Sequence, residues 1–433
     1  MDEPVYLKAP PAAASAGPDP VVAERVSEML LAIERGGADA LRAYSRELDG
    51  WDPPSFEIGA EQIAVATGSL PDSLLASIEF AQTQVRNFAE LQRATLTDFE
   101  AETLPGVFLG QRQVPVSSVG AYCPSGRVPM LACAFMTVLV PKVAGVDAVT
   151  ACSPPRSGTI HAPTLHAIAT SGADRIFALG GVQALAAMAF GIEDIGPVDM
   201  IVGPGNAFVA EAKRQLFGRV GIDLLAGPSE VAVIADDTAD PELVAADLLA
   251  QAEHGPSSPA VLITTSEPLG HAVIEEAARQ LDELAAAGAD DTSRHAWTDH
   301  GVVMVARDRD HAVTLSDQVA AEHLEVHTAD DAWYLERLRN YGSIFLGSRA
   351  TVAFSDKAIG TNHTLPTGRA ARYTGGLSVA KFLKTLTYQR IDSDEGVLAV
   401  APHVAEISRA DLMPAHEATA TKRLGRLHNH AAG

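Results

Sequence analysis

A glutamine and a histidine lie one helical turn apart in the segment QAEHGP, residues 251–256. The preceding residues predict a helix that begins at Pro241, after an N-capping Asp240, and that stops at the Gly-Pro pair. Gln251 and His254 therefore share one face of this helix, and the carboxyl end of a helix favours a cation. Two ligands do not make a metal site, and a solvated polar helix end is the simpler explanation of an isolated pair.

Further metal-ligating side chains occur later in the chain. Asp356 and His363 lie in the segment SDKAIGTNHTLPT, and His416 lies in LMPAHEA. Zinc takes about four donors, most often His, carboxylate or Cys, whereas Gln is a minority ligand. These residues are candidates to complete a site with Gln251 and His254, although sequence spacing does not show that they converge.

Glu322 and His323 lie in the segment AAEHLEVHT, where a helix ends and a strand begins. Adjacent side chains of a strand point to opposite faces, so both reach one substrate only from the end of the strand. A Glu-His pair at the loop end of a strand suits acid–base chemistry. From the pattern alone, a structural role is the simpler interpretation.

Glycine-rich turns occur in ALGGVQALAAMAFG, VGPGNAFVAEAKRQLFG and LLAGPSEVAVIA. Each places glycine at a strand end, where the backbone can approach a ligand and a helix can direct N–H groups at a phosphate. None matches G-x-G-x-x-G, so the standard dinucleotide fingerprint is absent. Each turn is weak evidence for a cofactor when taken singly.

The elements that position these residues fall into two series. Residues 20–100 have helical periodicity, and from about residue 115 short β-branched runs alternate with helices. This alternation predicts two Rossmann-like α/β units with parallel sheets. The predicted division is an N-terminal arm at 1–19, a first unit from 20–121 and 231–377, a second unit at 122–230, and a helical segment at 378–433.

Composition restricts the partners. The 433 residues are 47% hydrophobic and 20% charged, and 32 Lys and Arg face 55 Asp and Glu, so the net charge is −23. This charge disfavours nucleic acid and anionic membrane surfaces. The N-terminus lacks a secretory pattern, and the longest apolar run is shorter than the ~18 residues of a spanning helix. We expect a cytoplasmic protein whose three cysteines, which form no C-x-x-C pair, are reduced and mostly buried.

Six segments together resemble the histidinol dehydrogenase family, in the family's order and across nearly the whole chain. They are GGVQALAAMAFG, GPGNAFVAEAKRQ, GIDLLAGPSE, ADLLAQAEHGP, AAEHL and GTNHTLPT. The resemblance implies a zinc-containing, NAD-dependent homodimer that oxidises a primary alcohol through an aldehyde to a carboxylate. It also implies two incomplete Rossmann-like domains with small terminal segments exchanged between intertwined subunits.

The resemblance also implies roles for individual residues. The zinc ligands would be Gln251, His254, Asp356 and His416, with His416 donated by the other subunit, so that the two subunits share each active site. Glu322 would activate water to attack the aldehyde, and His323 would take up the alcohol proton. The NAD site would be lined by Tyr122, Gln183 and Asn206. The substrate would be contacted by Ser229, His363, His323, Asp411, Arg127 and the zinc ligands.

Several departures from the family pattern concern the substrate. Asp411 stands where members specific for histidinol carry a Glu that binds the substrate amine, and the segment 371–390 is similar to paralogues such as the sulfopropanediol dehydrogenases. Arg127 is either a clamp for an oxyanion group or an ordinary surface Arg. L-Histidinol is the default substrate, and a different small polar alcohol, such as sulfopropanediol, is the alternative. A metallohydrolase and a non-catalytic binding protein with a structural metal are more remote alternatives.

Overall fold

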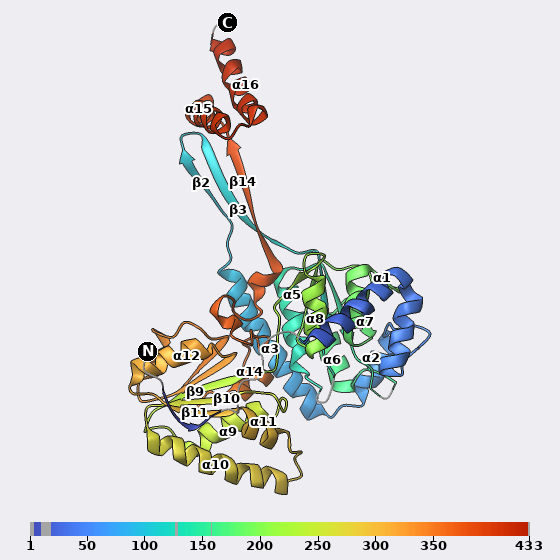
Figure 1. The fold of residues 1–433 in the computed structure, drawn as a ribbon. Coiled ribbons are helices and arrows are strands. Elements are labelled where there is room, and N and C mark those ends of the chain that lie inside the picture. The colour runs from blue at the N-terminus through green and yellow to red at the C-terminus, as the bar shows by residue number, and fades with distance from the viewer. Residues whose placement is uncertain (1–3, 10–18, 126–128, 157, 432–433) are drawn as a thin grey trace.

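The computed structural model describes residues 4–9, 19–125, 129–156 and 158–431 and consists of two α/β lobes and a projecting arm (Figure 1). Lobe A is built around a six-stranded sheet and lobe B around a five-stranded sheet, and the arm carries a third sheet of three strands. Parallel pairing dominates the two lobe sheets, so the predicted mixed α/β class with parallel sheets is confirmed.

The sheet of lobe A has the order β1-β11-β10-β9-β12-β13, in which all strands except β1 are parallel. The bounds of the parallel strands are β9 Val231–Ala235, β10 Ala260–Thr264, β11 Gly301–Val305, β12 His323–His327 and β13 Ser343–Leu346. Strands β9 and β10 are continuous apolar runs with every residue buried, as expected for central strands covered on both faces.

Helices cover both faces of this sheet. On one face lie α9 Pro241–Ala252, α10 Glu267–Ala286, α11 Thr292–His300 and α14 Val352–Lys357. On the other face lie α12 Arg309–Val319 and α13 Asp331–Leu335. The Asp240 carboxylate caps α9 by accepting from the Glu242 N–H at 2.9 Å, as the sequence predicts.

The sheet of lobe B has the parallel order β6-β5-β4-β7-β8. Its strands are β4 Ser118–Tyr122, β5 Ala148–Ser153, β6 Arg175–Ala178, β7 Met200–Val202 and β8 Gly221–Ile222. The helices that follow them in the chain are α4 Ala132–Ala134, η1 Phe135–Leu139, α5 Val140–Ala144, α6 Ala162–Thr170, α7 Gly181–Phe190 and α8 Ala207–Leu216. The predicted alternation of strands and helices is present in both lobes, although β4 begins four residues before the predicted boundary at 122.

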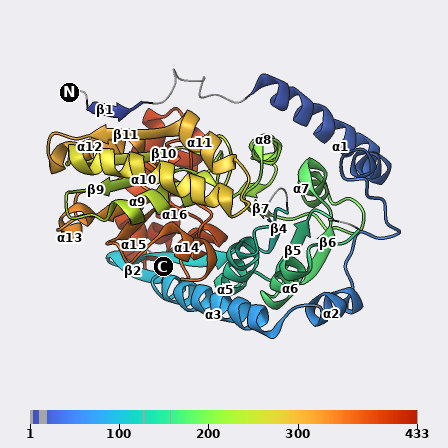
Figure 2. The ribbon, with the colours of Figure 1, turned by 90° about the horizontal axis from the view of Figure 1, so that it is seen from below.

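The N-terminal helices belong to lobe B, which corrects their predicted place beside residues 231–377. They are α1 Pro20–Asp49, α2 Ala60–Gly68 and α3 Asp72–Ala94. In Figure 2, α1 lies beside α7 and α2 lies beside α6, in agreement with the contacts between these helices. The reason is the apolar face of α1, from which Val26 and Ile33 pack into one core with Tyr122 and Leu185 of lobe B.

The N-terminal segment also differs from the predicted arm. Strand β1, Val5–Lys8, pairs antiparallel with β11 and thereby extends the sheet of lobe A within the same chain. The remainder of the predicted arm, residues 1–3 and 10–18, lies outside the described residues.

The projecting arm contains three strands that are not predicted from the sequence. Strands β2 Phe99–Leu104 and β3 Val107–Pro115 form a hairpin, and β14 Leu383–Ile391 pairs with β3 along its whole length. The predicted helical segment 378–433 is therefore helical only after β14, in α15 Asp394–Ala410 and α16 Pro414–Ala431. Short 3-10 turns, η2 Ala370–Arg372 and η3 Val379–Phe382, precede the strand. Helices α15 and α16 lie at the far end of the arm (Figure 1).

Helices of membrane-spanning length and apolarity do not occur in the part of the chain that the structure describes.

A buried ion pair fixes the loop after β7. Lys213 bonds to the Asp223 carboxylate and donates to the Gly203 carbonyl at 2.9 Å, and Asp223 accepts from the Gly203 N–H at 2.7 Å. Both side chains are almost completely buried, at 2% and 0% exposed. Removing one partner would leave an uncompensated charge, so Lys213→Met is expected to lower the free energy of unfolding by about 3–5 kcal/mol.

The measurement is chemical denaturation of the full-length protein. Arg294→Met serves as the matched control, because Arg294 pairs with Asp282 at the surface and its loss should cost about 0–1 kcal/mol. Equal denaturation midpoints for the two variants would contradict a stabilising role for the buried pair.

Candidate active site

The neighbouring strands β9 and β12 bring two chemistry-bearing segments together at their amino ends. His323 is the register partner of Val231, so Glu322 lies beside Ser229 and Glu230. Helix α9 runs back toward the same edge and ends there with Gln251. The candidate site therefore lies at the amino edge of the sheet, whereas sites in such folds usually lie at the carboxyl edge.

The Glu322 carboxyl group is buried and held by two donors. The Ser229 hydroxyl donates to Glu322 Oε2 at 2.5 Å, and the Glu230 N–H donates to the same oxygen at 3.0 Å. Burial raises the pKa of Glu322 to about 8, and the carboxylates of Glu230 and Asp356 act in the same direction. Glu322 is therefore placed to exchange a proton just above neutral pH, which is the property of a general base.

The His323 ring is buried in a fixed tautomer. Its Nδ1 lies 3.2 Å from the Glu230 carbonyl oxygen, and because a carbonyl only accepts, Nδ1 carries the proton. The opposite nitrogen, Nε2, has no hydrogen-bond partner and lies 4.0 Å from Asp356 Oδ1. Burial lowers the pKa of His323 to about 4, so the ring is neutral with a free lone pair. Such a nitrogen can accept a proton from a substrate hydroxyl.

Three of the predicted metal ligands converge beside this pair. His254 Nε2 lies 3.2 Å from Asp356 Oδ2. The Gln251 amide donates to Ser229 Oγ, whose own proton goes to Glu322, and this chain fixes the orientation of the amide. Gln251 Oε1 is consequently a buried oxygen without a hydrogen-bond partner.

The Asp356 carboxylate remains ionised in this environment. Burial alone would raise its pKa, but the hydrogen bond from His254 and the nearby imidazoles of His363 and His323 outweigh burial and hold the pKa below its ordinary value. The cluster thus combines an anionic oxygen, an amide oxygen and an imidazole, which is a plausible donor set for zinc by chemistry.

The predicted substrate contact His363 is buried and uses both ring nitrogens within the chain. Nδ1 lies 3.3 Å from the Asp356 carbonyl oxygen, and Nε2 lies 3.4 Å from Cys133 Sγ. Cys133 comes from lobe B, so this contact joins the two lobes. A pocket of about 280 Å³ opens next to it, lined by Asp356 and by apolar residues of α3 and of the segment 129–135.

The residues predicted for NAD lie along the carboxyl edge of the lobe B sheet. Tyr122 ends β4, and its hydroxyl accepts from the Gly181 N–H at 3.1 Å. Gln183 is buried and donates to Asp49 at 2.7 Å, and its Oε1 has no hydrogen-bond partner. Asn206 is exposed and caps α8. Tyr122 and Asn206 follow β4 and β7, the neighbouring strands between which the strand order reverses.

A close backbone approach occurs at this edge. Gly203 has φ +119°, and a Cβ at this position would lie 2.1 Å from the Tyr122 carbonyl oxygen. Only glycine fits there, which explains this part of the GPGN segment.

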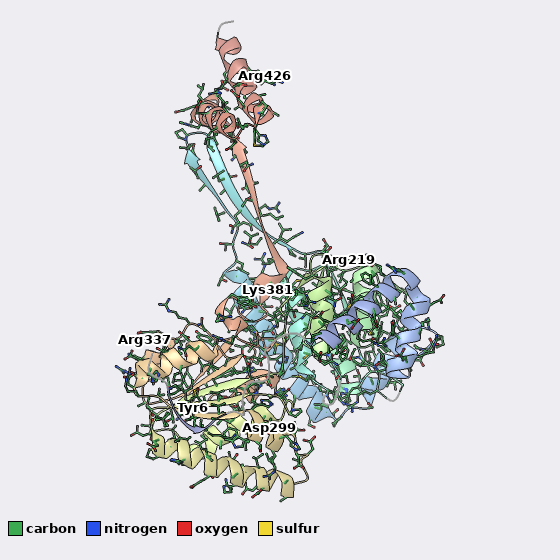
Figure 3. All side chains as sticks on the ribbon, viewed as in Figure 1. Tyr6, Arg219, Asp299, Arg337, Lys381 and Arg426 are labelled. Carbon is green, nitrogen blue, oxygen red and sulfur yellow. The ribbon has the colours of Figure 1, made fainter. Side chains whose placement is uncertain are left out.

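Three predicted residues are not brought to the site within the chain. Asp411 directly follows α15, His416 lies in α16, and both are exposed. Helix α16, where Figure 3 labels Arg426, lies at the tip of the arm. Arg127 lies outside the described residues. The within-chain cluster is therefore Ser229, Gln251, His254, Glu322, His323, Asp356 and His363.

Sequence reasoning missed other polar residues nearby. Cys133 is predicted only as one of three buried, reduced cysteines, and burial does raise the pKa of its thiol well above the ordinary value. Asp247, Glu325 and His327 form a second buried cluster. The alternation of polar residues in HLEVH is the signal that could have indicated that one face of this strand is polar.

Comparisons with known proteins agree with these observations. The family model described as histidinol dehydrogenase matches residues 15–424. A histidinol dehydrogenase homolog of Shouchella clausii is 55% identical over 369 residues, covering 85% of this chain and 86% of that protein. The sulfopropanediol 3-dehydrogenase of Ruegeria pomeroyi is 46% identical over 406 residues, covering 94% and 93%. The crystal structure of histidinol dehydrogenase from Elizabethkingia anophelis has a TM-score of 0.90 at 31% identity, covering 97% of this chain and 95% of that chain. The chain therefore belongs to the histidinol dehydrogenase family of oxidoreductases.

Proposed function

We propose that the protein is a zinc-dependent NAD+ oxidoreductase that converts a small polar primary alcohol, through the aldehyde, to the carboxylate. The observation that carries this proposal is the pairing of a free His323 Nε2 with a buried Glu322, beside a cluster of oxygen and nitrogen donors. Oxidation to a carboxylate needs a proton acceptor for the alcohol and a base for water, and these two side chains supply one each.

The donor set fits zinc. Gln251 Oε1 is a buried oxygen without a partner, and His254 Nε2 and Asp356 Oδ2 already lie at 3.2 Å from each other. These three residues and His416 of the partner subunit would hold the ion. When bound, zinc would orient and polarise the substrate oxygen without carrying electrons, as expected of a d10 ion.

The side chains of this chain then divide the proton transfers. NAD+, when bound, would supply the hydride acceptor for each of the two oxidations. His323 Nε2 accepts the hydroxyl proton of the alcohol. Glu322, in its carboxylate form, takes a proton from the water that attacks the aldehyde carbon. Ser229 and the Glu230 N–H keep the Glu322 carboxyl group in place through both steps.

The carboxyl edge of the lobe B sheet fits NAD+. The unpartnered Gln183 Oε1, the exposed Asn206 and the tight turn at Gly203 favour a cofactor there, because backbone at such a turn can approach a ligand closely.

The exposed arm favours a homodimer that shares its active sites. Apolar side chains lie exposed along it, including Phe99, Leu386, Ile407 and Leu412. An exposed apolar surface of this kind is typical of an interface. A partner subunit that packs on the arm would bury these side chains. It would also bring its own His416 to Gln251, His254 and Asp356.

The pH dependence of the second oxidation should report Glu322. Its pKa is raised above the ordinary value, so the carboxylate fraction grows as pH rises through about 8. With the aldehyde supplied directly, kcat/KM is expected to increase across this pH and then to level off. Steady-state NADH formation from about pH 6 to about pH 10 measures the profile. A flat profile would remove Glu322 from the role of base.

A comparison of candidate alcohols tests which substrate the protein oxidises. Identity of 46% to a sulfopropanediol 3-dehydrogenase, against 40% to a curated histidinol dehydrogenase, favours a non-histidine alcohol such as sulfopropanediol. We expect kcat/KM of the zinc-loaded protein for sulfopropanediol to exceed that for L-histidinol at least about tenfold, with 1,2-propanediol as the uncharged control. A preference for L-histidinol would establish the alternative substrate. Product formation without NAD+ would instead indicate a metallohydrolase.

A further inference from the structure

One face of strand β12 is entirely ionisable although it is buried. His323, Glu325 and His327 alternate along the strand and are at most 3% exposed, whereas Leu324 and Val326 pack into the core on the opposite face. Helix α9 covers the polar face, with Asp247 one turn before Gln251. His323 belongs to the site described above, but the proposed reaction uses neither Glu325 nor His327.

The atoms of this second cluster converge on one point. His327 Nε2 lies 3.3 Å from Glu325 Oε2 and 3.7 Å from Asp247 Oδ2, and ligand atoms of the three residues lie within 4.8 Å of one another. Separations of this size are those of atoms that share a cation at about 2.0–2.2 Å. Apart from their contact with each other, Glu325 Oε2 and His327 Nε2 have no hydrogen-bond partner, although both side chains are at least nine-tenths buried.

The outer oxygens of the two carboxylates are held from behind. The Val352 N–H donates to Glu325 Oε1 at 2.9 Å, and the Thr351 hydroxyl donates to Asp247 Oδ1 at 2.8 Å. These bonds leave the other oxygen of each carboxylate directed at His327. Donors that orient ligands in this way are typical of metal sites.

The charge of the cluster also requires compensation. Burial and the charge of Glu325 raise the pKa of Asp247 above its ordinary value, because two carboxylates share a site of low polarity. A divalent cation would neutralise both, as would a proton combined with a charged imidazole. The Asp247 side chain is 14% exposed, so solvent reaches the cluster from that side.

We propose that Asp247, Glu325 and His327 form a second metal site, which binds a divalent transition-metal cation such as Zn²⁺. One imidazole and two carboxylates suit zinc and manganese, with water completing the coordination. The ion would join α9 to β12 and so hold the helix that carries Gln251 and leads into the turn with His254. The proposal does not depend on the proposed reaction.

The number of zinc ions bound by a variant that lacks two of the ligands proposed for the first zinc site tests the proposal. The full-length Asp356→Asn, His254→Ala protein is stripped with a chelator, dialysed against Zn²⁺ alone and analysed for bound metal. We expect the reloaded protein to bind about one zinc per chain, and Co²⁺ in place of Zn²⁺ should give the visible absorption of a protein-bound ion. Adding His327→Gln should remove the bound metal, whereas the matched control His271→Gln, at an exposed histidine, should retain it.

Two results would overturn the proposal. If the Asp356→Asn, His254→Ala protein binds neither Zn²⁺ nor Co²⁺ at micromolar concentrations, the cluster holds a shared proton only. If His327→Gln retains the full complement of metal, the ion lies elsewhere. Because the first measurement leaves the second cluster unaltered, it does not depend on whether the His327 variant folds.

Discussion

Replacing Glu322 by glutamine is expected to slow conversion of the aldehyde to the carboxylate by about 10²–10⁴-fold and to leave oxidation of the alcohol much less affected. Glutamine has the same length, and its amide oxygen can still accept from the Ser229 hydroxyl and the Glu230 N–H. It cannot take a proton from water at neutral pH. His323 Nε2 remains free to accept the alcohol proton.

The measurement follows the two steps separately. With a limiting amount of alcohol and an aldehyde-trapping reagent, Glu322→Gln should form about one NADH per alcohol and accumulate trapped aldehyde. Glu230→Gln is the matched control, because the neighbouring Glu230 carboxyl group is half-buried, has a pKa raised to about 7, and accepts from the Gly368 N–H. Complete conversion to carboxylate by Glu322→Gln would show that another group activates water.

Mixing two variants that are each deficient in carboxylate formation is expected to restore that step if the arm exchanges between subunits. His416→Ala removes the ligand at the tip of the arm, and Glu322→Gln removes the base in the body. In a mixed dimer, one site receives an intact His416 from the Glu322→Gln subunit and an intact Glu322 from the other. Statistical exchange should therefore recover about a quarter of the wild-type activity for carboxylate formation.

The exchange is made by mild unfolding and refolding of an equimolar mixture. Each variant refolded alone is the control and should remain deficient in carboxylate formation. No recovery, with dimers shown by sedimentation to have mixed, would contradict a site shared between subunits.

The two sheets were predictable because their strands obey local rules. Apolar runs such as those of β9 and β10 alternate with amphipathic helices, and parallel pairing follows from that alternation. The arm was not predictable in this way. Strand β14 is exposed along nearly its whole length, so LKTLTYQRI has no buried face to produce an apolar pattern, and its pairing with β3 joins residues far apart in the chain. The place of α1 was equally hidden, because periodicity marks its apolar face but not its partner.

The candidate site was partly predictable for similar reasons. Helical spacing predicts Gln251 and His254 on one face of a helix, but α9 ends at Ala252 and His254 lies in the turn that follows. Only the fold, or a resemblance, could bring Asp356 beside them. The cluster of Asp247, Glu325 and His327 was missed because a period of two in a strand does not tell which face is buried. In HLEVH both faces are buried, and α9 supplies the polar partner from almost eighty residues earlier.

The most direct test of the proposed function is the number of NADH molecules formed per alcohol. Zinc-loaded wild-type protein is given excess NAD+ and a limiting amount of sulfopropanediol or L-histidinol, and the product is identified by mass spectrometry. We expect two NADH per alcohol consumed and a carboxylate product. No NADH from either alcohol, or a product that forms without NAD+, would contradict it.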